Sequence, residues 1–103
     1  MSVPLQGEVW WAETEDKRRP VLVVTRSEAV GVLTSIVVAP VTRTVRDIPT
    51  EVSLGEREGL PVDCAASFDN LQRIRRSALS LRAGVLGARQ HEICNALRAL
   101  ADC

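Results

Sequence analysis

The stretch Arg18-Arg19-Pro20-Val21-Leu22-Val23-Val24 decides the fold. Its last four residues are apolar and three of them are valines, which favours a strand buried on both faces, because β-branched side chains fit a pleated sheet. Pro20 lacks an N–H and fixes its own φ, so we expect it at the first residue of the strand. Arg19 is then held extended where a loop enters a rigid strand.

A guanidinium held at that point is preorganised to bind an anion. Arg19 can donate two parallel hydrogen bonds to a phosphate or a carboxylate. The alternative is a solvated arginine that only flanks a core strand, and this stretch alone favours that alternative because charged residues commonly flank strands. Lys17 is the one lysine among 13 basic residues, so arginine is common in this chain and each argument from a single arginine is weakened.

Length and composition predict one soluble domain over residues 1–103. A chain of 103 residues can bury a core but leaves little room for a second one. No apolar run approaches the ~18 residues of a membrane span and the first residues do not resemble a signal peptide, so we expect a cytoplasmic protein without a membrane partner. The 13 basic and 13 acidic residues give zero net charge, so any anion site must be local.

The three cysteines do not predict a metal site or a disulfide framework. Cys64, Cys94 and Cys103 are widely spaced, form no C-x-x-C pair and have a single histidine to help them. Cys64 lies in an apolar run and is expected in the core, while Cys103 is the chain end. Neither is interpreted as a nucleophile.

The remaining patterns predict five or six short strands and one helix, typical of a small, strongly bent barrel. The helix opens at residues 87–90 and ends near Asp102, with an apolar stripe at Ile93, Ala96, Leu97 and Leu100. His91 falls on its opposite face and is interpreted as a solvated residue. The expected strands cover residues 6–12, 20–24, 35–41, 50–54, 62–68 and 69–76, and residues 77–81 form either a helical turn or a strand end.

Two further features leave alternatives open. Trp10 and Trp11 face opposite sides of their strand, so one is expected in the core and the other partly exposed, where it packs or stacks on a base. The charged residues 13–18 lead into Arg19, and they form either a lid over a groove or a solvated connection.

Taken in order, these segments resemble the MazF/PemK family of bacterial toxins. The resemblance rests on a tryptophan-containing strand followed by Arg-Pro-Val-Leu-Val-Val, Val-Ala-Pro-Val-Thr, Ile-Pro-Thr-Glu-Val and Asp-Asn-Leu-Gln, and then by one amphipathic helix. It extends from about Gly7 to Leu100, and the order and spacing of five segments make it more specific than any one of them. It also favours the anion-binding interpretation of Arg19.

The resemblance implies an SH3-like barrel, mainly β with five to seven short strands and a C-terminal helix, that forms a homodimer and cuts single-stranded RNA. It implies that the toxin needs no metal or other cofactor and that a cognate antitoxin inhibits it. The catalytic arginine of the family corresponds to Arg19 and its threonine to Thr50. The polar residue of the RNA groove corresponds to Asn70, with Asp69 and Gln72 beside it.

These residue types suit cleavage by the 2′-hydroxyl of the RNA. Arg19 can stabilise the charge on a five-coordinate phosphorus, and Thr50 can hold an oxygen of the phosphate or the 2′-hydroxyl. No general base is assigned. The predicted RNA-binding residues are Lys17, Arg18, Thr42, Arg43, Asp69, Asn70, Gln72 and Arg73, and the arginines expected to contact phosphates or to form a solvated sheet edge are Arg43, Arg46, Arg73, Arg75 and Arg76. The alternative function is a toxin on the same barrel that poisons DNA gyrase without catalysis.

Overall fold

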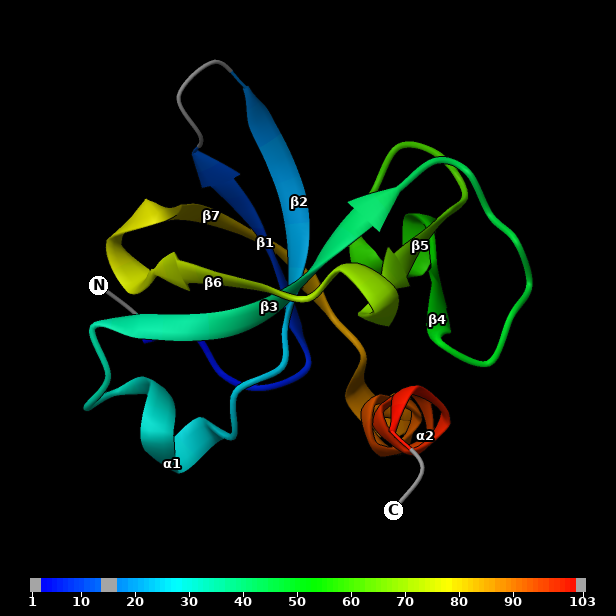
Figure 1. The fold of residues 1–103 in the computed structure, drawn as a ribbon. Helices are drawn as coiled ribbons and strands as arrows, with labels where there is room; N and C mark the ends of the chain where they lie inside the picture. Colours follow the sequence, from blue (N-terminus) through cyan, green and yellow to red (C-terminus); the bar gives the residue numbers. More distant parts are fainter. Residues whose placement is uncertain (1–2, 14–16, 102–103) are drawn as a thin grey trace.

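The structure, a computed structural model, describes residues 3–13 and 17–101. In these residues seven strands form one antiparallel sheet that curls into a half-barrel, and a helix follows near the C-terminal end (Figure 1). The path through the sheet is β4-β5-β3-β2-β1-β7, and β6 pairs with β3 off this path. The fold class expected from the sequence is therefore confirmed.

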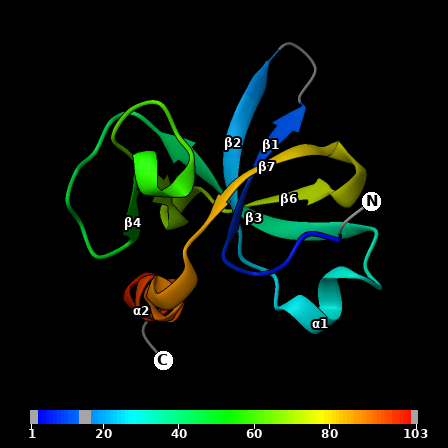
Figure 2. The ribbon, with the colours of Figure 1, turned by 180° about the vertical axis from the view of Figure 1, so that it is seen from behind.

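The elements have the following bounds. The strands are β1 (Glu8–Glu13), β2 (Arg18–Val23), β3 (Ser35–Thr42), β4 (Glu51–Leu54), β5 (Cys64–Ser67), β6 (Gln72–Arg75) and β7 (Leu79–Val85). The helices are α1 (Ser27–Val30) and α2 (His91–Leu100), and the short 3₁₀ turns are η1 (Glu56–Glu58), η2 (Phe68–Asn70), η3 (Arg76–Ala78) and η4 (Gly87–Arg89). Figure 2 shows α1 and α2 at the same end of the molecule.

The segment around β2 separates two cores, as its apolar run predicts. Leu22 and Val24 lie in one core, and Val21 and Val23 lie in the other. The first core consists of Val9, Leu22, Val24, Ala39, Val52, Leu54, Leu60, Cys64, Ala66, Phe68, Leu86, Ile93 and Ala96. The second consists of Trp10, Ala12, Val21, Val23, Val30, Ile36 and Val38.

β2 begins earlier than the sequence predicts. Its first residue is Arg18, and Pro20 is the third residue of the strand. The reason is that β1 alone supplies the pairing for the first half of β2, whereas β3 pairs only with Val21, Leu22 and Val23 in the described part of the chain. Pro20 therefore lies on a local sheet edge, where a missing N–H removes no ladder bond.

Two predicted segments differ in the late part of the chain. Residues 69–76 do not form one strand, because Asp69 and Asn70 belong to the turn η2, and β6 starts only at Gln72. Asp and Asn favour such turns because their side chains bond to nearby groups. β7 occupies residues 79–85, whereas the sequence predicts either a helical turn or a strand end over residues 77–81 and no strand beyond them.

The C-terminal helix is confirmed, with shorter bounds. Residues 87–89 form the turn η4 instead of the first helical turn, and α2 ends at Leu100; Asp102 and Cys103 lie outside the described residues. Ile93 and Ala96 are buried, while Leu100 at the end of the stripe is exposed. His91 is exposed and Cys64 is buried, as expected. No helix in the described ranges is long and apolar enough to cross a membrane.

Candidate functional site

A cavity of about 630 Å³ lies where β2 and β3 diverge. β3 pairs with β2 through Val38, Ala39 and Pro40, and its next two residues, Val41 and Thr42, pair with β5 instead. The first half of β2 stays paired with β1, so β2 and β3 separate from each other in a V (Figure 1). The switch of partners along β3 thus opens the space in which the cavity lies.

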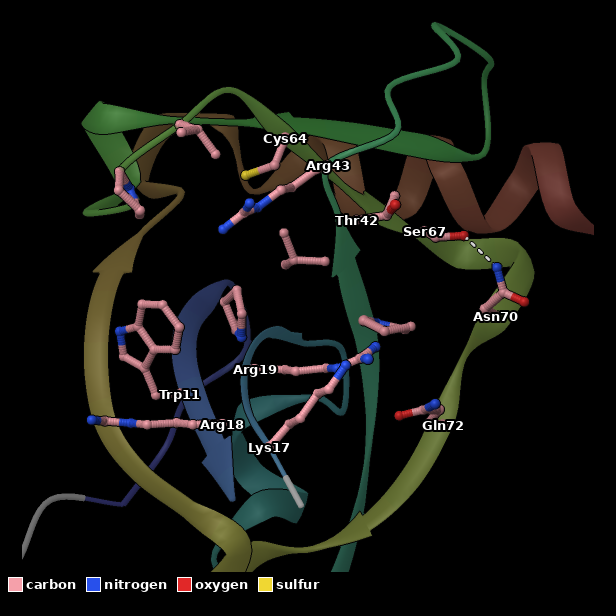
Figure 3. Close-up of a pocket in the computed structure, with 15 residues that line it drawn as sticks. Trp11, Lys17, Arg18, Arg19, Thr42, Arg43, Cys64, Ser67, Asn70 and Gln72 are labelled. Atoms are coloured by element: carbon pink, nitrogen blue, oxygen red, sulfur yellow. Dashed lines mark hydrogen bonds between the residues drawn. The ribbon is translucent and has the colours of Figure 1, made fainter. Parts of the chain in front are cut away.

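Positive side chains surround this cavity. Lys17, Arg18 and Arg19 reach it from the start of β2, and Arg43 reaches it from the residue after β3 (Figure 3). Among the described residues that line the cavity, these four are cationic and none is acidic. The cavity therefore has a locally positive field although the chain has no net charge.

Polar groups line the wall formed by β3, β5, η2 and β6. Thr42, Ser67, Asn70 and Gln72 contribute hydroxyl and amide groups (Figure 3). The Asn70 side-chain amide donates a hydrogen bond of 2.9 Å to Ser67 Oγ, which fixes its orientation. The Thr42 hydroxyl accepts a hydrogen bond of 3.1 Å from the backbone N–H of Thr44. Together the cations and polar groups suit a polyanion whose bases carry donors and acceptors.

Three predicted site residues do not line the cavity. The Thr50 hydroxyl donates a hydrogen bond of 2.6 Å to Asp69 Oδ2, and the backbone N–H of Phe68 donates to the Thr50 carbonyl at 2.9 Å. Thr50 directly precedes β4, and β3 and β5 lie between β4 and β2 in the sheet. Arg73 is exposed on β6, opposite Val37 of β3. The structure thus places Thr50 beside Asp69 and outside the cavity that holds Arg19.

The other arginines expected to contact phosphates lie elsewhere. Arg46 and Arg75 are exposed and do not line the cavity. The Arg76 guanidinium donates a hydrogen bond of 2.7 Å to the carbonyl of Val30, so it ties η3 to α1. The prediction that residues 13–18 form a lid or a solvated connection concerns residues 14–16, which lie outside the described residues.

Eight lining residues were absent from the predicted site, and Trp11 and Cys64 are the two with the most distinctive chemistry. Trp11 is half-buried, and the Arg18 guanidinium carbon lies 5.5 Å from the centroid of its ring. The alternation along β1 indicated that one tryptophan would be partly exposed, but not that it would face this cavity. Cys64 also lines the cavity; burial raises the pKa of its thiol, Asp63 and Glu58 raise it further, and Arg43 opposes them. A thiol held protonated in this way is a poor nucleophile.

Comparison with known proteins identifies relatives of the whole described fold. Residues 5–101 match a family model described as PemK-like, MazF-like toxin of type II toxin–antitoxin system. A probable endoribonuclease MazF2 of Mycobacterium tuberculosis is 40% identical over 100 residues, which cover 95% of this chain and 98% of the relative. A probable endoribonuclease MazF5 of the same species is 37% identical over 105 residues, covering 99% and 96%.

Solved structures agree with these sequence matches. The Mycobacterium tuberculosis toxin MazF-mt6 is similar with a TM-score of 0.80 and 34% identity, over 89% of this chain and 93% of that chain. An endoribonuclease from a mycobacterial species, solved in complex with its cognate antitoxin, has a TM-score of 0.79 and 26% identity, over 93% and 92%.

Proposed function

The chain belongs to the PemK-like, MazF-like toxin family of type II toxin–antitoxin systems, and on that premise we propose how it acts. It is a MazF-like toxin, and relatives named endoribonuclease support an RNA-cleaving hydrolase. Gyrase poisoning is not favoured, because those relatives carry the name of a nuclease. The single observation that supports the site is the cavity between β2 and β3, which has four cations and no acidic residue among its described lining.

The proposed substrate is single-stranded RNA, cut at a short sequence without metal. The 2′-hydroxyl loses its proton as its oxygen attacks the adjacent phosphorus, and the bond to the 5′-oxygen breaks as that oxygen gains a proton. The products therefore carry a cyclic phosphate and a 5′-hydroxyl. Arg19 donates hydrogen bonds to the five-coordinate phosphorus, where negative charge develops. Lys17, Arg18 and Arg43 bind neighbouring phosphates through their positive charges. Unpaired RNA is preferred because only splayed bases expose their edges.

We propose that Thr50 contacts the RNA beside the cavity. The turn η2 connects the two places. Asn70 of η2 lines the cavity, and the preceding residue, Asp69, accepts the hydrogen bond from the Thr50 hydroxyl. An RNA strand that continues past Asn70 therefore reaches this pair. Because the Thr50 hydroxyl already donates to a carboxylate, its oxygen is left as an acceptor, which suits a 2′-hydroxyl that donates.

The proposed assembly is a homodimer in the cytoplasm, and a cognate antitoxin inhibits it. A relative solved with its cognate antitoxin supports that partner. We expect an acidic antitoxin segment to lie in the cavity, where it faces Arg19 and Arg43, because complementary charges favour that register. Light scattering of the purified protein should give the mass of two chains; a mass of one chain would contradict the dimer.

The experiment that tests the function is cleavage of a long single-stranded RNA in EDTA, with cut sites mapped by primer extension. We expect cuts at one short recurring sequence, cyclic phosphate ends, and no cleavage of DNA or of duplex RNA. Thr50→Val, which removes the hydroxyl and keeps the shape, should slow cleavage at least about tenfold, the scale of one lost contact in the transition state. A folded wild type that cuts none of several RNAs would refute the nuclease.

A further inference from the structure

The chain has few side chains on which a base can stack. Its aromatic residues are Trp10, Trp11 and Phe68. Phe68 is 1% exposed and Trp10 is 7% exposed, and the Trp10 indole N–H donates a hydrogen bond of 3.0 Å to Glu8 Oε1. His91 is exposed, but it lies on α2 and does not line the cavity. Among the aromatic side chains, only Trp11 is both partly exposed and part of the cavity wall.

One face of the Trp11 ring has room for a planar group, as the position of the Arg18 guanidinium over it shows. The Arg18 guanidinium carbon is 5.5 Å from the ring centroid, within the reach of about 6 Å for a cation over an aromatic face. The Arg18 side chain is held there by an ion pair of 3.6 Å with Glu13, in which both side chains are about half exposed. Exposed ion pairs of this kind contribute little, so Arg18 can move away at small cost.

The surroundings of Trp11 suit the flat apolar face of a base. Pro20 is the cross-strand neighbour of Trp11 in the β1–β2 pairing, and Pro20, Pro61 and Val62 line the same cavity. Figure 3 shows Trp11 at one end of the cavity and Asn70 and Gln72 at the other, with Arg19 between them. The cavity thus combines apolar lining residues with a cationic centre, and its volume of about 630 Å³ falls in the range of ligand sites.

We propose that Trp11 is a base-stacking platform of the RNA site and that Arg18 covers it until RNA binds. The proposal rests on the proposed function and adds to it a residue that binds a base of the RNA, whatever its identity. A base that enters takes the place of the Arg18 guanidinium over the indole, and Arg18 is released toward a phosphate. The competing view is that Trp11 only packs, since it also contacts the first core.

The test uses tryptophan fluorescence and two ten-nucleotide 2′-O-methyl oligonucleotides. One carries random bases and the other carries none. Neither can be cut, because the methyl group removes the nucleophile. Trp10 is buried, so acrylamide quenches chiefly Trp11 in the wild type. We expect the base-bearing oligonucleotide to change the emission and to protect Trp11 from acrylamide, and the abasic one to bind without either effect.

Variants give a second readout by anisotropy of the labelled base-bearing oligonucleotide. Trp11→Leu should weaken binding about 5- to 150-fold, the range that stacking on one base gives. Trp11→Phe should recover most of that loss, and Trp10→Phe, the matched control, should bind like the wild type. Equal protection by the two oligonucleotides, or wild-type affinity in a folded Trp11→Leu, would overturn the stacking role and leave the proposed function standing. If the wild type binds neither oligonucleotide, the stacking role and the RNA site both fail.

Discussion

Glu8 shows how one buried carboxylate holds several segments. Its Oε1 atom accepts hydrogen bonds from the backbone N–H of Leu5 at 2.8 Å and from the Trp10 indole at 3.0 Å, and its Oε2 atom pairs with Arg82 at 3.1 Å. Burial raises the pKa of the Glu8 carboxyl, but these hydrogen bonds and the charge of Arg82 outweigh burial, so its pKa is lowered. The folded state therefore favours the ionised form.

This lowered pKa predicts a pH-dependent stability. A group with a lowered pKa stabilises the fold above its unfolded pKa of about 4.3, and the contribution is lost as the pH falls through the folded value. The wild type should therefore melt at a higher temperature than Glu8→Gln at pH 7. Thermal unfolding should show the gap shrinking between about pH 5 and pH 3. A gap that does not vary with pH would show that the ionised carboxylate is not responsible.

The site residues show what a sequence can and cannot specify. Arg19 could be singled out because a proline and an apolar run fix its backbone at a strand entry. Thr50 and Arg19 are far apart in the sequence, and whether they meet depends on the curl of the sheet. Alternation predicts that one of Trp10 and Trp11 is partly exposed but not which one, and the neighbours of Trp11 depend on where β3 leaves β2. Local chemistry is readable from the sequence, whereas convergence of distant residues is not.

At the scale of elements, β7 and η1 cross so closely that only glycine fits. A Cβ on Gly84 would lie 2.3 Å from the carbonyl oxygen of Glu58, whereas a Cβ on Gly31 would meet nothing within 4 Å. Gly84→Ala should therefore lower the unfolding free energy by about 2 kcal/mol or more. Gly31→Ala, the matched control at φ −68°, should change it by less than about 1 kcal/mol. Urea unfolding measures both; equal stability of the two variants would refute the close crossing.

β7 is hard to predict from the sequence because contacts with other segments, and not its own residues, fix its position. The strand contains Arg82, Ala83 and Gly84, which have weaker strand preference than the valine-rich runs of β2 and β3. Its position is fixed by pairing with β1, with register shifts at two points, and by the contact with η1. Strands defined by β-branched runs are predictable from sequence, whereas a strand defined by its neighbours is not.

At the scale of the whole molecule, zero net charge makes the electrostatic attraction of RNA depend on local groups of cations such as the cavity lining. Four cations line the cavity, and binding to a single strand weakens with salt by a slope of about −0.7 for each phosphate neutralised. The logarithm of affinity against the logarithm of salt concentration should therefore have a slope of roughly −3. Arg43→Ala should reduce its magnitude by about 0.7. Anisotropy of the labelled 2′-O-methyl oligonucleotide from low to high salt measures this; a slope near zero would contradict an electrostatic site.

The most direct test of the central claim compares two arginines in one cleavage assay. Arg19 lines the cavity between β2 and β3, whereas Arg98 lies on α2 and does not line it. Single-turnover cleavage of one mapped RNA site in EDTA should slow at least about 100-fold in Arg19→Ala, as expected for loss of a donor to the transition state. Arg98→Ala should cleave within about twofold of the wild type. A folded Arg19→Ala that cleaves at the wild-type rate would show that the cavity is not the catalytic site.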